Sequence, residues 1–483
     1  MHAPQNPKST DDAPESDESN GVAGRYNFVV LIVYQVVLRI GWIFKTESVI
    51  MPAVLDSLGG PGWLRGCLPM LNRFGQSVTP LLIARQVKIA PRKKWVQFLS
   101  SAVMSVVFGT LAAIWHFGGA RRADESQAVV LAAMFLLLYA IFFMANGANQ
   151  LSLNTLLGKL IVPTSRGRMM LLANVLGSIF AVSAAAVFLP RWLAPGLADF
   201  RWVFGTSALF FALAAVSTIL LREPGDNYEQ PRSPVREKIR DAYNTLAADA
   251  NFRRLALVAV LFDSSVMLFP HYQALARSER VQLDMTNMMQ WVVAQNIGTA
   301  LFSLLGGPLA DRMGNRMVLR VLVLAICCAP GLAIALSHAQ SLSSHWFLLV
   351  FVLVGMTPVV IRTLQHYTLE VAPPSEHPRY LSSLSLCLVL PILLSPLVGK
   401  LIDRVGFDPV FLGIAALVLV GWLTTFRLDE PRHAHGAGWR RGRYAGRIGV
   451  GNWLPIKAAG RPRYNETGGL APFRSDIRDE EFA

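Results

Sequence analysis

The sequence of 483 residues contains few charged side chains and few cysteines. Charged residues make up 16% of the chain, whereas soluble proteins carry about 25%. This low charge argues against a large soluble enzyme with many buried helices, because its surface would need far more charged side chains. The four cysteines lie in apolar runs, and we interpret them as packing residues rather than as disulfides or metal ligands. They are Cys67, Cys327, Cys328 and Cys387.

Several motifs of enzymes and pumps are also missing. The sequence has no nucleotide-binding loop of the form G-x-x-x-x-G-K-[ST], no H-E-x-x-H motif and no paired-cysteine metal site. No nucleophile with a base stands out. We therefore predict no enzyme, no catalytic or metal-ligating residue and no cofactor, and we find no support for ATP-driven export. No apolar core with a cleavage site precedes the first long apolar run, so we expect no cleaved signal peptide.

Long apolar runs are abundant. Each is long enough to cross about 30 Å of hydrocarbon as a helix. The first six runs cover residues 27–55, 63–86, 95–117, 127–157, 168–190 and 201–222. The second six cover residues 252–275, 285–310, 317–338, 346–370, 379–401 and 407–427. The sequence therefore predicts an all-α integral membrane protein.

Polar segments divide the chain into parts. We predict a disordered cytoplasmic tail at residues 1–25, a six-helix bundle at 26–222, a cytoplasmic linker at 223–251, a second six-helix bundle at 252–427 and a basic cytoplasmic tail at 428–483. The net charge of +14 comes from basic residues in loops and in the last tail. This distribution favours the inner face of a membrane and its anionic lipid over nucleic acid. It predicts a multi-pass protein of the plasma (inner) membrane with both termini in the cytoplasm.

One loop between two apolar runs has a specific pattern. Residues 307–319 match G-x-L-A-D-R-x-G-x-R-x-x-L at every fixed position. This stretch resembles the signature loop of the major facilitator superfamily. The resemblance implies twelve transmembrane helices in two pseudo-symmetric six-helix bundles, alternating access and solute transport. It also implies a gating role for Gly307, Asp311, Arg312, Gly314 and Arg316.

The two halves of the chain are similar to each other. Pro163 and Arg168 follow the fourth apolar run with the spacing that Pro374 and Arg379 keep after the tenth, as a parallel repeat predicts. The first half departs from the pattern, because residues 80–94 contain no counterpart of Asp311.

Ionisable side chains within the apolar runs are the candidates for transport. Such groups cost roughly 2.5–3.5 kcal/mol each at mid-depth, so their presence needs a reason. Arginines outnumber acids among them, and arginine suits carboxylate or phosphate. Glu47 and Asp263 can titrate and are the candidates for proton coupling. The predicted substrate-binding residues are Arg39, Arg73, Asn146, Asn149, Gln150, Arg362 and His366.

Structural interpretations of the same residues remain open. The arginines could pair internally, Arg39 with Glu47 or Arg73 with Asp263, the amides could join helices, and His366 could be a core histidine.

The sequence predicts a secondary transporter that moves a small anionic or polar organic solute by alternating access, coupled to protons or another ion. Its expected partners are the solute, membrane lipid and the coupling ion. One alternative is a proton-coupled exporter of cationic or amphipathic drugs. Another is a transport-inactive membrane sensor or scaffold on the same fold.

Overall fold

The computed structural model describes residues 13–117, 125–193, 199–226, 235–283, 288–339, 344–373 and 376–429. All regular secondary structure in these ranges is helical. Ten segments of these ranges are long and apolar enough to cross a membrane. Two more polar helices, α3 (Gly62–Ile89) and α11 (Met288–Met313), lie at the second and eighth predicted spans. The prediction of an all-α integral membrane protein is confirmed.

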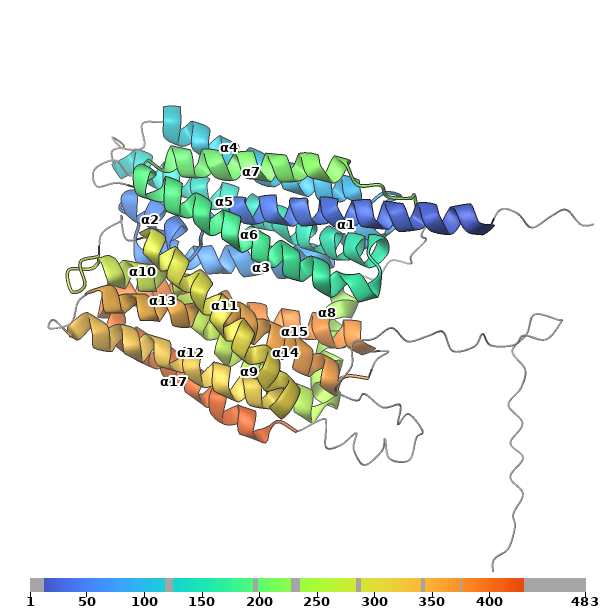
Figure 1. The fold of residues 1–483 in the computed structure, drawn as a ribbon. Coiled ribbons are helices and arrows are strands. Elements are labelled where there is room, and N and C mark those ends of the chain that lie inside the picture. Colours follow the sequence, from blue (N-terminus) through green and yellow to red (C-terminus); the bar gives the residue numbers. More distant parts are fainter. Residues whose placement is uncertain are drawn as a thin grey trace, which may run out of the picture. The chain divides into compact units, whose positions relative to one another are not determined.

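The first bundle is built from long helices (Figure 1). Besides α3, it contains α1 (Ala13–Ile43), the short α2 (Ile50–Ser57), α4 (Lys94–Phe117), α5 (Glu125–Leu160), α6 (Pro163–Trp192) and α7 (Phe200–Ile219). Within it, α4 packs against α7 and α5, α3 packs against α5, and α1 packs against α6 and α7.

The second bundle follows the short helix α8 (Val235–Ala248). Besides α11, it contains α9 (Ala250–Asp263), the 3-10 helix η2 (Ser264–Leu268), α10 (Phe269–Arg277), α12 (Asn315–His338), η4 (Ser344–Phe347), α13 (Leu348–Val354), α14 (Thr357–Val371), α15 (His377–Ile392), α16 (Ser395–Val405), α17 (Phe407–Thr424) and η6 (Thr425–Arg427). Three predicted spans are thus broken. The helices that resume after a break carry Pro270, Pro358 and Pro396 in their first turn, where a missing N–H costs nothing.

The first predicted span is also interrupted. We expected a continuous span over residues 27–55, but α1 ends at Ile43. The Thr46 hydroxyl donates to the Ile43 carbonyl at 2.7 Å, and so supplies a hydrogen bond to a carbonyl group at the C-terminal end of α1. The Thr46 carbonyl accepts the N–H of Ile50 at 2.8 Å, and α2 starts there. The polar side chains of residues 45–48 consequently lie in a bend.

Two polar segments contain helix that we did not expect. The tail predicted to be disordered at residues 1–25 is helical from Ala13, and its acidic residues are of the kind that a helix N-terminus favours. The linker predicted at residues 223–251 contains α8, and Asp249 caps α9 by accepting the N–H of Phe252 at 2.9 Å. The remainder of these segments, residues 1–12 and 227–234, and the basic tail from residue 430 lie outside the described residues.

The two bundles repeat the same close helix crossings. A Cβ atom placed on Gly147 of α5 would lie 2.2 Å from the Gly75 carbonyl oxygen of α3. In the second bundle, a Cβ atom on Gly355 would lie 2.1 Å from the Gln295 carbonyl oxygen of α11. Small residues at such crossings let membrane helices approach closely. The predicted pseudo-symmetry therefore extends to the packing of the second helix against the fourth in each half.

Candidate transport site

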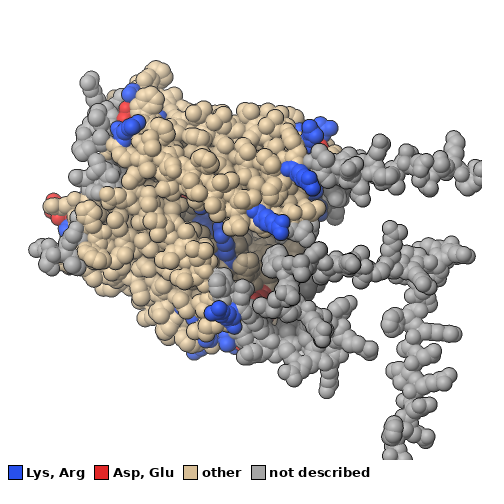
Figure 2. All heavy atoms as spheres, viewed as in Figure 1, with Lys and Arg blue, Asp and Glu red and all other residues tan. Residues whose placement is uncertain are grey.

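The two bundles meet closely at the end that carries α2 and α16, which we call the α2 end. There the Gly62 N–H donates to Asp403 Oδ2 at 2.7 Å, and a Cβ atom on Gly399 would lie 2.1 Å from the Gly62 carbonyl oxygen. Asp56 of α2 binds Arg65 of its own bundle at 3.0 Å and Arg277 of the other bundle at 3.4 Å. These contacts close the α2 end. Nearer the opposite end, which carries α8, Figure 2 shows a hollow between the bundles with blue Lys or Arg atoms inside it.

Arg39 and Arg362 bring positive charge to the space between the bundles, and neither has an acidic partner among the described residues. Arg39 of α1 donates to the Asn174 amide oxygen of α6 at 2.9 Å. Arg362 of α14 is exposed and forms no hydrogen bond or ion pair with a described residue. The two guanidinium groups repel each other across the bundles. His366, also exposed, lies one helical turn after Arg362. This arrangement is a fixed positive site that an anion would neutralise.

Arg73 and Asp263 form an ion pair across the bundles. Arg73 Nη2 of α3 lies 2.5 Å from Asp263 Oδ1 at the end of α9. The Asp263 side chain is fully buried, and its Oδ2 atom has no hydrogen-bond partner among the described residues. The sequence left two ion pairs open, and the structure contains the pair of Arg73 with Asp263. Arg39 does not pair with Glu47 but with Asn174.

Glu47 lies in the bend between α1 and α2. It accepts a hydrogen bond from Asn72 of α3, and Asn72 in turn accepts one from Gln76 one turn along. Glu47 is also attracted by Arg73. The two candidate proton acceptors, Glu47 and Asp263, thus act on the same arginine, one from each bundle.

The three candidate amides on α5 have different environments. Asn149 is satisfied within its own bundle, because it accepts from the Tyr34 hydroxyl at 2.9 Å and donates to Ser101 at 2.8 Å. Gln150 is exposed. Asn146 is fully buried, and neither of its amide atoms has a partner among the described residues. Asn149 therefore joins helices, whereas Asn146 keeps its donors and acceptor unused.

The predicted gating loop spans the junction between α11 and α12. Gly314 has a φ of 85°, a conformation that glycine adopts at little cost. Arg316 donates to the Leu428 carbonyl at 3.0 Å, and Arg312 is exposed. The side chain of Asp311 and the surroundings of Gly307 lie outside the described part of the chain.

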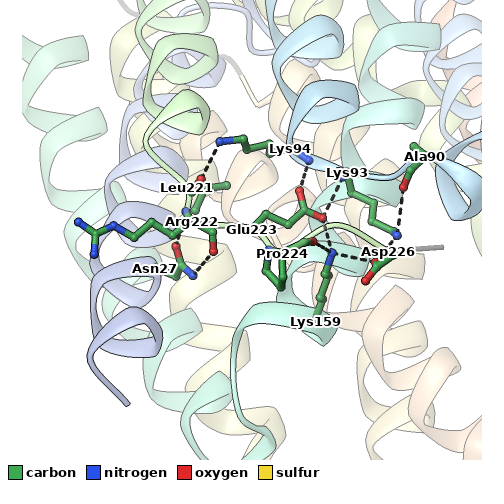
Figure 3. A network of polar contacts seen from close by, with 10 residues as sticks. All are labelled: Asn27, Ala90, Lys93, Lys94, Lys159, Leu221, Arg222, Glu223, Pro224 and Asp226. Carbon is green, nitrogen blue, oxygen red and sulfur yellow. Dashed lines mark hydrogen bonds and ion pairs between the residues drawn. The ribbon is translucent and has the colours of Figure 1, made fainter. Parts of the chain in front are cut away.

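The first bundle has a polar network at the corresponding place, which the sequence did not reveal as a site (Figure 3). Glu223, which follows α7, accepts the backbone N–H groups of Lys93 and Lys94 at 2.9 and 2.7 Å, and Lys159 of α5 at 2.9 Å. Lys94 also donates to the Leu221 carbonyl at 2.8 Å, as Arg316 does to Leu428. Glu223 thus supplies an acid where residues 80–94 have none. The sequence signal was the tetrapeptide L-R-E-P at 221–224, repeated as L-D-E-P at 428–431.

A second acid, Asp226, completes this network. It forms ion pairs with Lys159 at 2.8 Å and with Lys93. Hydrogen bonds from Lys159 and then Lys93 lower the pKa of the Asp226 carboxyl below its ordinary value. On α1, Asn27 exchanges two hydrogen bonds of 2.9 Å with the backbone of Arg222. The segment after α7 consequently ties four helices of the first bundle together.

Comparison with known proteins agrees with this architecture. The profile of the family described as Major Facilitator Superfamily matches residues 279–472. The predicted resemblance to this superfamily is confirmed over this part of the chain. No curated protein sequence matches the chain. Within the part that the structure describes, no group of three metal-binding side chains occurs.

Solved structures of several transporters have a similar fold. The nucleoside transporter NupG, in a mutant form, is 13% identical with a TM-score of 0.66, covering 84% of this chain and 100% of its own. A POT family transporter in complex with 5-aminolevulinic acid is 12% identical with a TM-score of 0.63, covering 83% and 95%. The human organic anion transporter TETRAN is 15% identical with a TM-score of 0.55, covering 83% and 99%. At these identities the three structures show that the chain shares their fold.

Proposed function

We propose that this protein is a secondary transporter that carries a small organic anion by alternating access. The observation that carries the proposal is the placement of Arg39 and Arg362, one from each bundle, beside the same space and without an acidic partner in the described part of the chain. Arginine cannot release its charge, and its planar fork suits carboxylate or phosphate. An anion held between these two groups would bind both bundles at once, as alternating access requires. His366 and Asn146 are the further polar groups that would complete such a site.

The charged pair at Arg73 supports proton coupling in this proposal. Asp263 holds Arg73 across the bundles with one oxygen, while its other oxygen is buried without a partner among the residues that the structure describes. A proton on Asp263 would remove the charge that binds Arg73 and so weaken the link between the bundles. Glu47, which also attracts Arg73, would then take over as its counter-charge.

The orientation belongs to the same proposal. We place both termini, the linker with α8 and the basic tail in the cytoplasm of the plasma (inner) membrane. Figure 1 shows the N-terminal end of α1 and helix α8 at the same end of the bundles. The closed α2 end would then face outward.

Flux into reconstituted vesicles tests the function. Purified protein is assayed against a panel of carboxylates, phosphate esters and organic cations, with the pH varied on each side. We expect uptake of an anion, and a loss of roughly tenfold or more in Arg39→Lys, Arg73→Lys and Arg362→Lys, because a charge-assisted hydrogen bond contributes about 1.5–3 kcal/mol. The matched control is Arg168→Lys, an exposed arginine at the start of α6.

The same assay separates the alternatives. Preference for a cation, with all three lysine variants active, would overturn the anion proposal and favour an exporter that uses Asp263 and Glu47. A folded protein that moves no solute of the panel at any pH would favour the sensor or scaffold.

A further inference from the structure

Lys45 is a buried ammonium group that the candidate site does not use. It lies in the bend between α1 and α2 with 1% of its surface exposed, and its Nζ atom has no hydrogen-bond partner among the described residues. Aromatic rings surround it instead. The distances from Nζ to the ring centroids are 3.7 Å for Trp42, 4.2 Å for Phe143, 5.0 Å for Phe142 and 5.6 Å for Tyr139.

This aromatic cage can hold either protonation state of Lys45. Ring faces attract an ammonium ion, most strongly when water is excluded. They offer no hydrogen bonds, however, and an ammonium ion that has lost its water without gaining hydrogen bonds is costly to bury. A neutral amine loses the attraction to the rings but avoids that cost. The two forms are therefore closer in free energy here than at an exposed lysine, so a small change in the surroundings can select one of them.

The charges around Lys45 come from the bend itself and from helices α3 and α9. Glu47 lies two residues further along the bend and attracts Lys45. Arg73 of α3 and Asp263 of α9 form the pair next to Glu47. From α5, the Tyr139 hydroxyl has no hydrogen-bond partner among the described residues and lies in the field of Glu47. With Lys45 protonated, these two bases and two acids carry no net charge, and with Lys45 neutral they carry one negative charge.

The bend is also attached to the second bundle. The Ser48 hydroxyl donates to Gln295 of α11 at 2.5 Å, and Ser48 is buried. Opening the α2 end would break this contact and bring water to the bend. A proton could then leave Lys45 for water, with the N–H bonding electrons remaining on Nζ, and return by the reverse step.

We propose that Lys45 is a proton-binding site of the transport cycle, protonated while an anion is bound between Arg39 and Arg362 and neutral when the carrier returns empty. This inference rests on the proposed function. Its physical reason is electrostatic, since the negative charge that a neutral Lys45 leaves behind would repel the anion. Proton and anion would therefore bind together and move in the same direction.

Thermal unfolding tests the protonation of Lys45 without any solute. The melting temperature is measured by tryptophan fluorescence between about pH 6 and about pH 9 for the wild type and Lys45→Met, with the exposed Lys88→Met as control. A native state that binds fewer protons than the unfolded chain gains stability as the pH rises. As the pH rises over this range, we expect the melting temperature of the wild type to increase by several degrees relative to that of Lys45→Met. The difference in melting temperature between the wild type and Lys88→Met should stay constant. A constant difference between wild type and Lys45→Met would overturn the proposal. Lys45→Gln replaces Lys45→Met if the latter does not fold.

Transport provides the second arm. Lys45→Arg keeps the positive charge but cannot release the proton. We expect this variant to exchange anion between the two sides of a vesicle at a rate near that of the wild type, while its net uptake falls roughly tenfold or more, because the empty carrier cannot return. Net uptake equal to that of the wild type would refute the role of Lys45. If no anion of the panel is carried at all, the proposed function fails, and the melting measurements still decide whether Lys45 titrates.

Discussion

Adding one methyl group at Gly399 should open the α2 end. Gly399 of α16 faces Gly62 of α3 in the other bundle, and a Cβ atom at Gly399 would lie 2.1 Å from the Gly62 carbonyl oxygen and 2.8 Å from the Trp63 nitrogen. Since a carbon–oxygen contact normally needs about 3.3 Å, α16 must move away from α3 by roughly 1 Å in Gly399→Ala. Such overpacking costs about 1–3 kcal/mol. The movement also stretches the 2.7 Å hydrogen bond from the Gly62 N–H to Asp403.

This cost falls only on the conformation in which the two helices touch. Because each 1.4 kcal/mol changes an equilibrium tenfold, we expect the population with a closed α2 end to fall by about 5- to 150-fold relative to the open one. Spin labels on cysteines introduced at Val129 of α5 and Glu279 after α10, both exposed, report the separation of the bundles at this end. Their distance distribution should shift to longer values in Gly399→Ala.

Two other glycines serve as controls for this substitution. Gly147→Ala makes an equally close contact, with Gly75, but within the first bundle, so it should lower the melting temperature without lengthening the label distance. Gly331→Ala has no neighbouring atom within 4 Å and should change neither. The reasoning is refuted if Gly399→Ala lowers the melting temperature like Gly147→Ala and leaves the label distance unchanged.

Three further predictions concern the network after α7 and the orientation. Glu223→Gln should destabilise the first bundle by about 1.5–3 kcal/mol, measured by chemical denaturation, because a buried acceptor of three hydrogen bonds loses its charge. The pKa of Asp226 is lowered by Lys159 and Lys93, so its contribution is present above the ordinary carboxyl pKa and is lost as the pH falls through the lowered value. Asp226→Asn should therefore reduce the fall of the melting temperature at acidic pH, and an unchanged fall would contradict this. For the orientation, a cysteine at Glu279 should react in intact cells with an impermeant reagent and one at Arg240 should not, and the opposite pattern would reverse the topology.

The fold was predictable because its signals are local. Apolar runs of sufficient length and one loop pattern indicate the helices and the superfamily, and both follow from the composition of short segments. The breaks in the helices were not predictable in the same way. The end of α1 depends on the hydrogen bonds of Thr46. Threonine also occurs inside other helices of this chain, so its presence in the sequence does not mark a helix end. The network around Glu223 joins residues more than 60 positions apart, so no window of the sequence contains it.

The candidate site was predictable in its residues but not in its pairing. A charge within an apolar run is visible in the sequence, and Arg39, Arg73 and Asp263 were found in this way. Helical spacing says which residues share a face, but not which helix of the other bundle that face meets. The pairing of Arg73 with Asp263 and the cage of Lys45 therefore required the structure, since the rings of the cage come mostly from α5.

The repeat itself indicates where function should reside. In each half an asparagine at the start of the first predicted span, or directly before it, binds the chain that follows the sixth span. Asn27 binds Arg222, and Asn251 accepts the N–H of Asp429 at 3.0 Å. Arg39 and Asp263 each lie twelve residues after their asparagine, so the same position of the repeat carries opposite charges in the two halves. Packing elements that occur in both halves support both conformations equally, and substitutions there should lower stability. The charges in the space between the bundles break the symmetry, so substitutions there should change solute and proton binding while the bundles remain folded.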